Sequence, residues 1–168
     1  MNPSDTERAE FHAFELALEA VESSSQHLMS LLGEELALLK VRDVSALEDV
    51  AQRKVSAIET VAAAWESMRS QLQGLGAPDN EVSTQAESYI ERLPAPERVR
   101  AQQRWQQLSD LTTEIWTSNR INGRMLEVAH QNTSAVLNVL RGETTASGVY
   151  GRDGAIATAP PSRVLAHT

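Results

Sequence analysis

The hydrophobic residues of this chain recur every three or four positions over most of its length. This spacing places them along one face of an α-helix and is typical of helices that pack against other helices. The first such run predicts a long helix over residues 5–42, with Ser4 and Glu7 forming a capping box at its start. The face expected to pack consists of Phe11, Phe14, Leu18, Val21, Ser25, Leu28, Leu32 and Leu39.

A second run predicts a helix over residues 45–73. Ser45 and Glu48 form another capping box, so we expect the chain to turn tightly just before them. The sequence Gly74-Leu75-Gly76-Ala77-Pro78 ends this helix, because glycine adopts the left-handed cap conformation and proline blocks continuation. A short connection between two long amphipathic helices predicts an antiparallel hairpin. The packing face of the second helix is expected to be Leu47, Ala51, Lys54, Ile58, Val61, Trp65, Met68 and Leu72.

One charged residue, Lys54, interrupts this second face. Because a lysine can bury its aliphatic stem and keep its ammonium group in polar surroundings, we expect Lys54 to reach water or a facing carboxylate, Glu35 or Glu34.

A short helix is predicted over residues 80–93, capped by Asp79 or Asn80. Proline is tolerated in the first turn of a helix, so Pro96 can open a third long helix over residues 96–141. The face of the short helix is Val82, Ala86, Tyr89, Ile90 and Leu93. The face of the third long helix is Trp105, Leu108, Thr112, Ile115, Asn119, Asn122, Leu126, Ala129, Thr133, Val136 and Leu140.

Two successive positions on this last face are asparagines, Asn119 and Asn122, and Gly123 follows. A glycine inside a helix costs about 1 kcal/mol relative to alanine. The pattern favours a structural role, in which buried asparagines fix the register of the helix. Bending of the helix and contact with a partner are the alternatives. Trp105 and Trp116 fall on nearly the same face, and core packing is their simplest explanation.

The third helix exceeds both hairpin helices in length, since about 45 residues would span ~68 Å. It therefore either overhangs its partners or breaks near Gly123.

The composition favours an all-α fold. Apolar residues make up 41% of the 168 residues, but only two Phe, two Tyr and three Trp are present, which suits packed helices better than a β-sandwich. We predict an elongated antiparallel hairpin plus a third long helix in a three-helix bundle or coiled coil, forming one domain over residues 1–142. Residues 143–168 are dominated by small residues and proline and are expected to form a flexible tail.

Charge and candidate chemistry exclude several classes of function. The net charge of -8, without clustered arginines, disfavours nucleic acid as a partner. No cysteine is present, and the four histidines do not pair with each other or with carboxylates at metal-binding spacing, so we expect no metal and no other cofactor. The sequence contains no phosphate-binding loop and no nucleophile motif, so we expect that the protein is not an enzyme.

The start of the chain lacks the basic and apolar segments of a secretory signal, and no stretch approaches the ~20 apolar residues of a membrane helix. We therefore expect a cytoplasmic protein without stable membrane insertion.

The predicted tail contains one distinctive segment, Val149-Tyr150-Gly151-Arg152-Asp153-Gly154. An aromatic residue beside a glycine turn is either a recognition motif or a simple turn. Together with the leading hairpin and the N-x-x-N-G run at Asn119–Gly123, this segment resembles the FlgN-type flagellar export chaperones. The resemblance covers nearly the whole chain, and the combination of N-x-x-N-G with Tyr-Gly-x-x-Gly is its specific part.

This resemblance implies a cytoplasmic chaperone of flagellar type III secretion. Such a chaperone binds hook-associated junction proteins, prevents their premature assembly and delivers them to the export gate. In the family, the tail tyrosine is linked to docking on the gate protein, and Tyr150 matches it. Substrate binding by the family's C-terminal amphipathic region maps here to Met125, Leu126, Ala129, Val136, Leu137 and Leu140.

Two other classes of function fit the pattern. A self-associating coiled coil or helical bundle would form concentration-dependent oligomers without any chaperone role. A small enzyme or regulator would need titratable groups around Asn119 and Asn122, and the sequence offers none. Because the helix faces are acidic and solvated, we expect mostly monomer, with a weak dimer as the alternative.

Overall fold

The computed structural model describes residues 3–76 and 81–141 of the chain. This described part is all-α, and its helices pack against one another, which confirms the predicted fold class. The helices are α1 (Pro3–Val41), α2 (Val44–Gly74), α3 (Val82–Arg92) and α4 (Ala95–Leu140). The chain divides into two parts, Met1–Leu126 and Glu127–Thr168, and each is considered by itself. Within residues 3–76 and 81–141, no helix combines the length and hydrophobicity needed to cross a bilayer.

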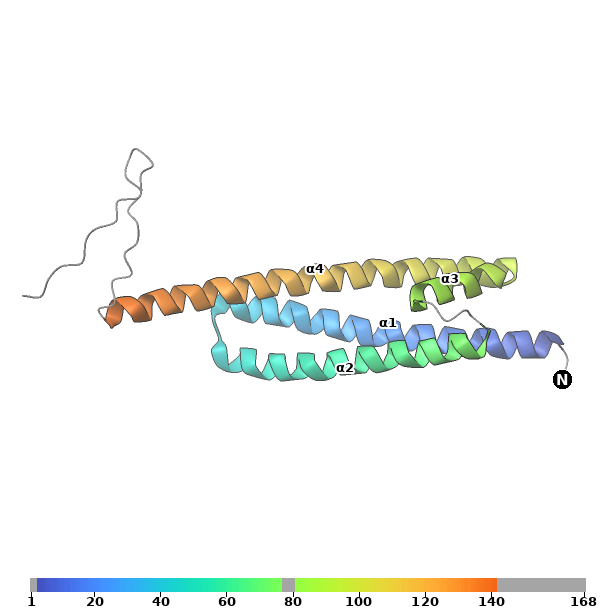
Figure 1. Ribbon diagram of the computed structural model, residues 1–168, viewed down its shortest axis with the longest axis horizontal. Helices are drawn as coiled ribbons and strands as arrows, with labels where there is room; N and C mark the ends of the chain where they lie inside the picture. Colours follow the sequence, from blue (N-terminus) through green and yellow to red (C-terminus); the bar gives the residue numbers. More distant parts are fainter. Residues whose placement is uncertain (1–2, 77–80, 142–168) are drawn as a thin grey trace, which may run out of the picture. The chain divides into compact units, whose positions relative to one another are not determined.

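Helices α1 and α2 form an antiparallel hairpin (Figure 1). Arg42 enters the turn with a left-handed φ of 58°. Asp43 then caps α2, because its Oδ1 accepts a hydrogen bond from the backbone N–H of Ala46 at 3.1 Å. The predicted cap at Ser45 is wrong: this residue lies inside the helix and its hydroxyl donates to Asp43 at 3.0 Å. The bond from Ala46, followed by that from Ser45, lowers the pKa of Asp43.

The other end of α2 stops as the glycine pattern predicts. Gly76 has a φ of 75°, in the left-handed region that glycine favours, and its N–H donates to the carbonyl of Gln73. The predicted caps Asp79 and Asn80 lie outside the described residues. Helix α3 follows, and all five residues of its predicted face are buried.

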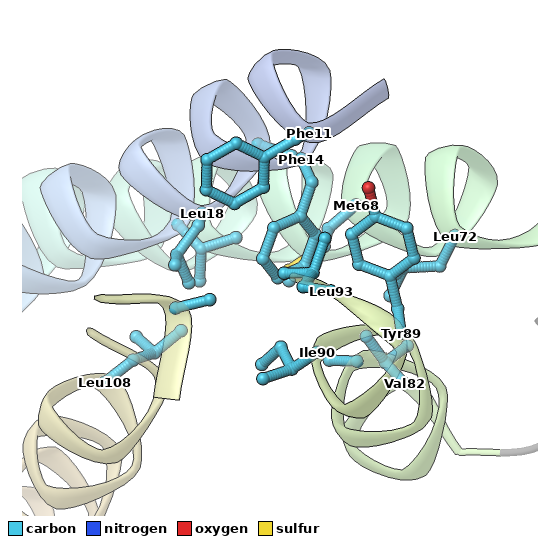
Figure 2. Packing of buried hydrophobic residues seen from close by; sticks show 14 residues of the cluster. Phe11, Phe14, Leu18, Met68, Leu72, Val82, Tyr89, Ile90, Leu93 and Leu108 are labelled. Carbon is cyan, nitrogen blue, oxygen red and sulfur yellow. The ribbon is translucent and has the colours of Figure 1, made fainter. Parts of the chain in front are cut away.

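The larger of two hydrophobic clusters joins all four helices (Figure 2). Phe14 of α1 meets Tyr89 of α3 with ring centroids 4.9 Å apart, and burial raises the pKa of Tyr89. Trp65 of α2 contacts Trp105 of α4 edge-on at 6.1 Å. The buried residues are Phe11, Phe14, Ala17, Leu18, Val21, Met68, Leu72, Val82, Ala86, Tyr89, Ile90, Leu93, Ala101 and Leu108.

The smaller cluster lies further along the hairpin. It consists of Leu28, Leu31, Leu32 and Ala57, with Val61 and Ile115 partly buried against it. Helix α4 follows α1 in the same direction, because Arg104 pairs with Glu22 at 2.6 Å and Asn122 contacts Leu32. The bond from Arg104 to Glu22 raises the pKa of the guanidinium.

Not all of the residues expected to pack are covered. Trp116 is 62% exposed, so the prediction of core packing for this residue is wrong. The guanidinium of Arg120 stacks over its indole ring at 4.6 Å from the centroid. On α2, Ala51 and Ile58 belong to the predicted packing face but are exposed. The hairpin therefore buries less of α2 than the sequence pattern indicates.

Candidate protein-binding site on α4

Helix α4 keeps a strict seven-residue repeat along one line of its surface. Leu108 is 1% exposed, Ile115 packs against the smaller cluster and Asn122 is 3% exposed. These three residues face the hairpin. The same repeat continues in sequence at Ala129 and Val136, but both of those side chains are exposed.

Asn122 is held by groups from the hairpin. Its Nδ2 donates to the carbonyl of Leu32 at 2.8 Å and to Oε2 of Glu35 at 2.9 Å. The other carboxylate oxygen, Oε1 of Glu35, pairs with the ammonium of Lys54 at 2.5 Å, which confirms one of the expected partners of that lysine. Asn122, Glu35 and Lys54 form a polar cluster that links α4, α1 and α2.

The side chains of this polar cluster are largely buried. The side chains of Lys54 and Glu35 are only 19% and 11% exposed. Buried polar groups are tolerated when they are hydrogen-bonded, and they favour the one register in which their partners meet. The cluster therefore has the properties of a register-fixing contact between α4 and the hairpin.

The other asparagine and the glycine lie in different surroundings. Asn119 and Gly123 are both exposed, so only one of the two asparagines faces the hairpin. A Cβ added at Gly123 would meet no atom within 4 Å, and α4 is helical on both sides of it. Close packing therefore does not require a glycine at this position, and its role as a hinge stays a prediction.

The residues assigned to substrate binding are mostly exposed. Met125 is half-buried and Leu126 is 55% exposed at the end of the first part of the chain. In the second part, the exposed fractions are 59% for Val136, 44% for Leu137 and 76% for Leu140, and Ala129 is also exposed. We call the four residues of the second part, Ala129, Val136, Leu137 and Leu140, the C-terminal stripe.

The geometry of a helix places these four residues together. At about 100° per residue they fall within an arc of about 100°. Val128 is also 55% exposed, but it points about 130° away from the centre of that arc. The stripe is therefore a surface distinct from the rest of α4.

The chemistry of the stripe is apolar. Between Val128 and Leu140 the sequence has no Asp, Glu, Lys or Arg. Contiguous exposed apolar side chains mark sites of protein association, and anchors spaced by three, four and seven residues suit an amphipathic helix. Such a surface can bind another protein by burying apolar area.

Within residues 3–76 and 81–141, no group of His, Asp and Glu side chains could hold a metal ion. Tyr150, the residue assigned to gate docking, lies outside the described residues.

The sequence pattern did not single out the stacked pair of Trp116 and Arg120. Their spacing of four residues places them on one helix face and could have indicated the contact.

Over the described residues, the fold and the site define a helical bundle protein with an exposed apolar helix face. The description "FlgN protein" belongs to a family model that matches residues 11–158, so the chain belongs to the FlgN family. FlgN proteins are chaperones of flagellar protein export and assembly. No curated protein and no solved structure matches the chain significantly.

Proposed function

We propose that this protein is a cytoplasmic type III export chaperone for the hook-associated junction proteins of the flagellum. It binds them before export, prevents their premature assembly and delivers them to the export gate. The observation that carries the proposal is the exposed C-terminal stripe in a chain of the FlgN family.

The stripe suits a substrate that exposes an amphipathic helix. Such a segment would otherwise self-associate, because its apolar face drives polymer contacts. Burial of that face against Val136, Leu137 and Leu140 would block assembly while the substrate stays bound. Apolar burial contributes about 25 cal/mol per Å² before the cost of association, so a few large side chains suffice for reversible binding.

Substitution within the stripe tests this function. The double variant Val136→Ser with Leu140→Ser should weaken binding of a purified hook-associated junction protein at least about tenfold, since each change removes an apolar anchor. Isothermal titration calorimetry measures the affinity. The matched control is Val128→Ser, which alters an equally exposed apolar residue outside the stripe and should leave the affinity unchanged.

A second arm separates substrate binding from delivery. Tyr150→Ala should retain the affinity for the junction protein and weaken capture of the complex by the purified export gate protein. Equal binding by the wild type and the stripe variant would contradict the assignment of the site. An oligomer of the chain alone that the stripe variant dissolves, without loss of junction-protein binding, would support the self-associating alternative.

A further inference from the structure

Helix α2 carries a second exposed row of apolar side chains. Val44, Val55 and Ile58 are 67%, 57% and 48% exposed. The row continues through smaller or half-buried residues at spacings of three or four, which keeps it on one face. We call this set the α2 outer stripe: Val44, Leu47, Ala51, Val55, Ile58 and Ala62. At 1.5 Å per residue it is about 27 Å long.

The α2 residues that pack with α3 lie outside this stripe. Helix α3 packs on the later part of α2, where Met68 and Leu72 are fully buried. The smaller cluster, at the earlier part of α2, contains no residue of α3 among those that the structure describes. A fourth helix therefore accompanies α2 over only part of its length.

Acidic residues flank the α2 outer stripe on its exposed side. Glu48, Glu59 and Glu66 follow one another by eleven and seven residues, which places them along the same edge of the helix. Glu66 pairs with Arg69 at 3.5 Å. Within residues 3–76 and 81–141, neither Glu48 nor Glu59 has a basic group within 4 Å.

Each basic residue of α2 already forms an ion pair. Arg53 pairs with Glu34 at 2.9 Å and with Asp49 at 3.3 Å, and these bonds raise its pKa. Lys54 belongs to the polar cluster, and Arg69 pairs with Glu66. At the edge of the stripe, Glu48 and Glu59 therefore lack a basic partner within the helix, whereas Glu66 has one.

We propose that the α2 outer stripe docks an amphipathic helix of a partner protein whose apolar face is flanked by Lys or Arg. The apolar side chains pack on Val55 and Ile58, and Ala51 and Ala62 allow a close approach of the helix axes. The basic side chains, about three turns apart, meet Glu48 and Glu59.

A second copy of the chain fits this face poorly. Antiparallel pairing of two α2 helices would bring two acidic edges together, and in parallel pairing α2 has no uncommitted cation to meet the acidic edge of its partner. Anionic lipid headgroups are disfavoured for the same reason. The charge of the edge therefore selects a basic helix.

The surface also differs from the C-terminal stripe in its expected salt dependence. Binding at the C-terminal stripe occurs in a segment without Asp, Glu, Lys or Arg, so it should respond little to salt. Binding on α2 should weaken as salt screens Glu48 and Glu59. The inference does not depend on the proposed function.

The test uses the full chain and two labelled 18-residue helical peptides with identical Leu faces. One peptide carries Lys eleven residues apart beside the Leu face, and the other carries Glu there. Fluorescence anisotropy should show at least tenfold tighter binding of the Lys peptide at low salt, and this preference should shrink at high salt. The double variant Val55→Ser with Ile58→Ser should lose at least tenfold in affinity for the Lys peptide.

Three controls locate the binding. Leu16→Ser changes a residue that is 53% exposed on α1 and should leave the affinity unchanged. The C-terminal stripe variant, Val136→Ser with Leu140→Ser, should also bind the Lys peptide normally, so failure of one site is distinguishable from failure of the other. Glu48→Lys with Glu59→Lys should reverse the preference in favour of the Glu peptide. Circular dichroism checks that each variant is folded.

Three results would overturn the proposal. The first is equal binding of the two peptides. The second is loss of Lys-peptide binding in the Leu16→Ser or C-terminal stripe variant to the same extent as in the α2 variant. The third is a dimer in analytical ultracentrifugation that Val55→Ser with Ile58→Ser dissociates, because the α2 outer stripe would then be covered by a second copy.

Discussion

The two hydrophobic clusters of the bundle differ in how many helices build them. The larger cluster buries fourteen residues contributed by α1, α2, α3 and α4, whereas the smaller one buries four residues of α1 and α2 with Ile115 of α4 partly buried against them. Helix α3 contributes four residues to the larger cluster, Val82, Ala86, Tyr89 and Ile90, and Leu93 directly follows the helix. The fourth helix therefore accounts for much of the difference in apolar burial.

Where α3 is absent, polar contacts join the helices. The polar cluster of Asn122, Glu35 and Lys54 lies beside the smaller cluster, and Arg53 bridges α2 to Glu34 of α1 nearby. Apolar burial is non-directional, whereas these contacts require one alignment of the three helices. We therefore expect the larger cluster to supply most of the stability and the polar cluster to set the register.

Matched truncations of two leucines should show the largest difference. Leu18 in the larger cluster and Leu31 in the smaller one are each 1% exposed. Truncation of a buried leucine to alanine costs about 2–5 kcal/mol, depending on how far the site can collapse. Leu18→Ala should fall in the upper half of this range and Leu31→Ala in the lower half, because fewer helices enclose Leu31.

Urea unfolding monitored by circular dichroism measures both free energies. The matched control is Leu16→Ala on the exposed side of α1, which should change the free energy of unfolding by less than about 0.5 kcal/mol. Equal losses for Leu18→Ala and Leu31→Ala would remove the proposed difference between the clusters.

Substitution of the two asparagines should change the free energy of unfolding by less than truncation of the leucines. Asn122→Ala should lower the free energy of unfolding by about 1–3 kcal/mol, because Glu35 and the carbonyl of Leu32 lose a buried donor. Asn119→Ala should change it by less than about 0.5 kcal/mol, since Asn119 is exposed. Chemical denaturation of the two variants side by side tests this. Similar losses for both would contradict a special role for the polar cluster.

Much of this architecture is readable from the sequence. The three-four spacing predicts helices that pack against one another, and the predicted face of α1 is buried from Phe11 to Leu32. The partner of Lys54 is also predictable, because a lysine inside an apolar face needs a nearby carboxylate, and Glu35 supplies it. Lys54 thus shows that a charged residue in a regular apolar pattern can identify a contact between helices.

The remaining features depend on packing that periodicity does not encode. A repeat of three and four defines two lines of residues on α4, and the second line meets the hairpin over only part of its length. Trp105 on this line contacts Trp65 of α2, whereas Asn119 on the same line is exposed. Trp116 looks like a core residue by size, yet its position along α4 leaves it stacked with Arg120 instead. Ile58 belongs to the predicted packing face of α2 but is 48% exposed, which the spacing alone does not reveal.

The candidate site also depends on exposure that the sequence pattern does not encode. The C-terminal stripe is visible as a pattern, but a pattern does not distinguish buried from exposed residues, and the exposure of Val136 and Leu140 comes from the structure. Their assignment to substrate binding comes from the resemblance to the FlgN family and stays a prediction.

The smallest expected effect concerns the turn of the hairpin, which lies beyond the smaller cluster. Asp43→Ala removes the acceptor for the N–H of Ala46, so the first turn of α2 should fray while the larger cluster stays intact. Hydrogen exchange followed by NMR should show faster exchange at Ala46 and unchanged exchange at Leu18. Asp43→Asn is the control, because an asparagine also caps helices and should restore the protection of Ala46.

The pH dependence separates the charge of Asp43 from its capping geometry. Its pKa in the folded protein is lowered from 3.8, first by the bond from Ala46, so the ionised form is the one that the fold stabilises. The contribution is therefore fully present above the unfolded pKa and is lost as the pH falls through the lower, folded pKa. The wild type should approach Asp43→Ala in that acidic window, whereas Asp43→Asn should show no change attributable to this residue. A difference between wild type and Asp43→Ala that persists below the folded pKa would show that the carboxylate charge is not what holds the first turn of α2.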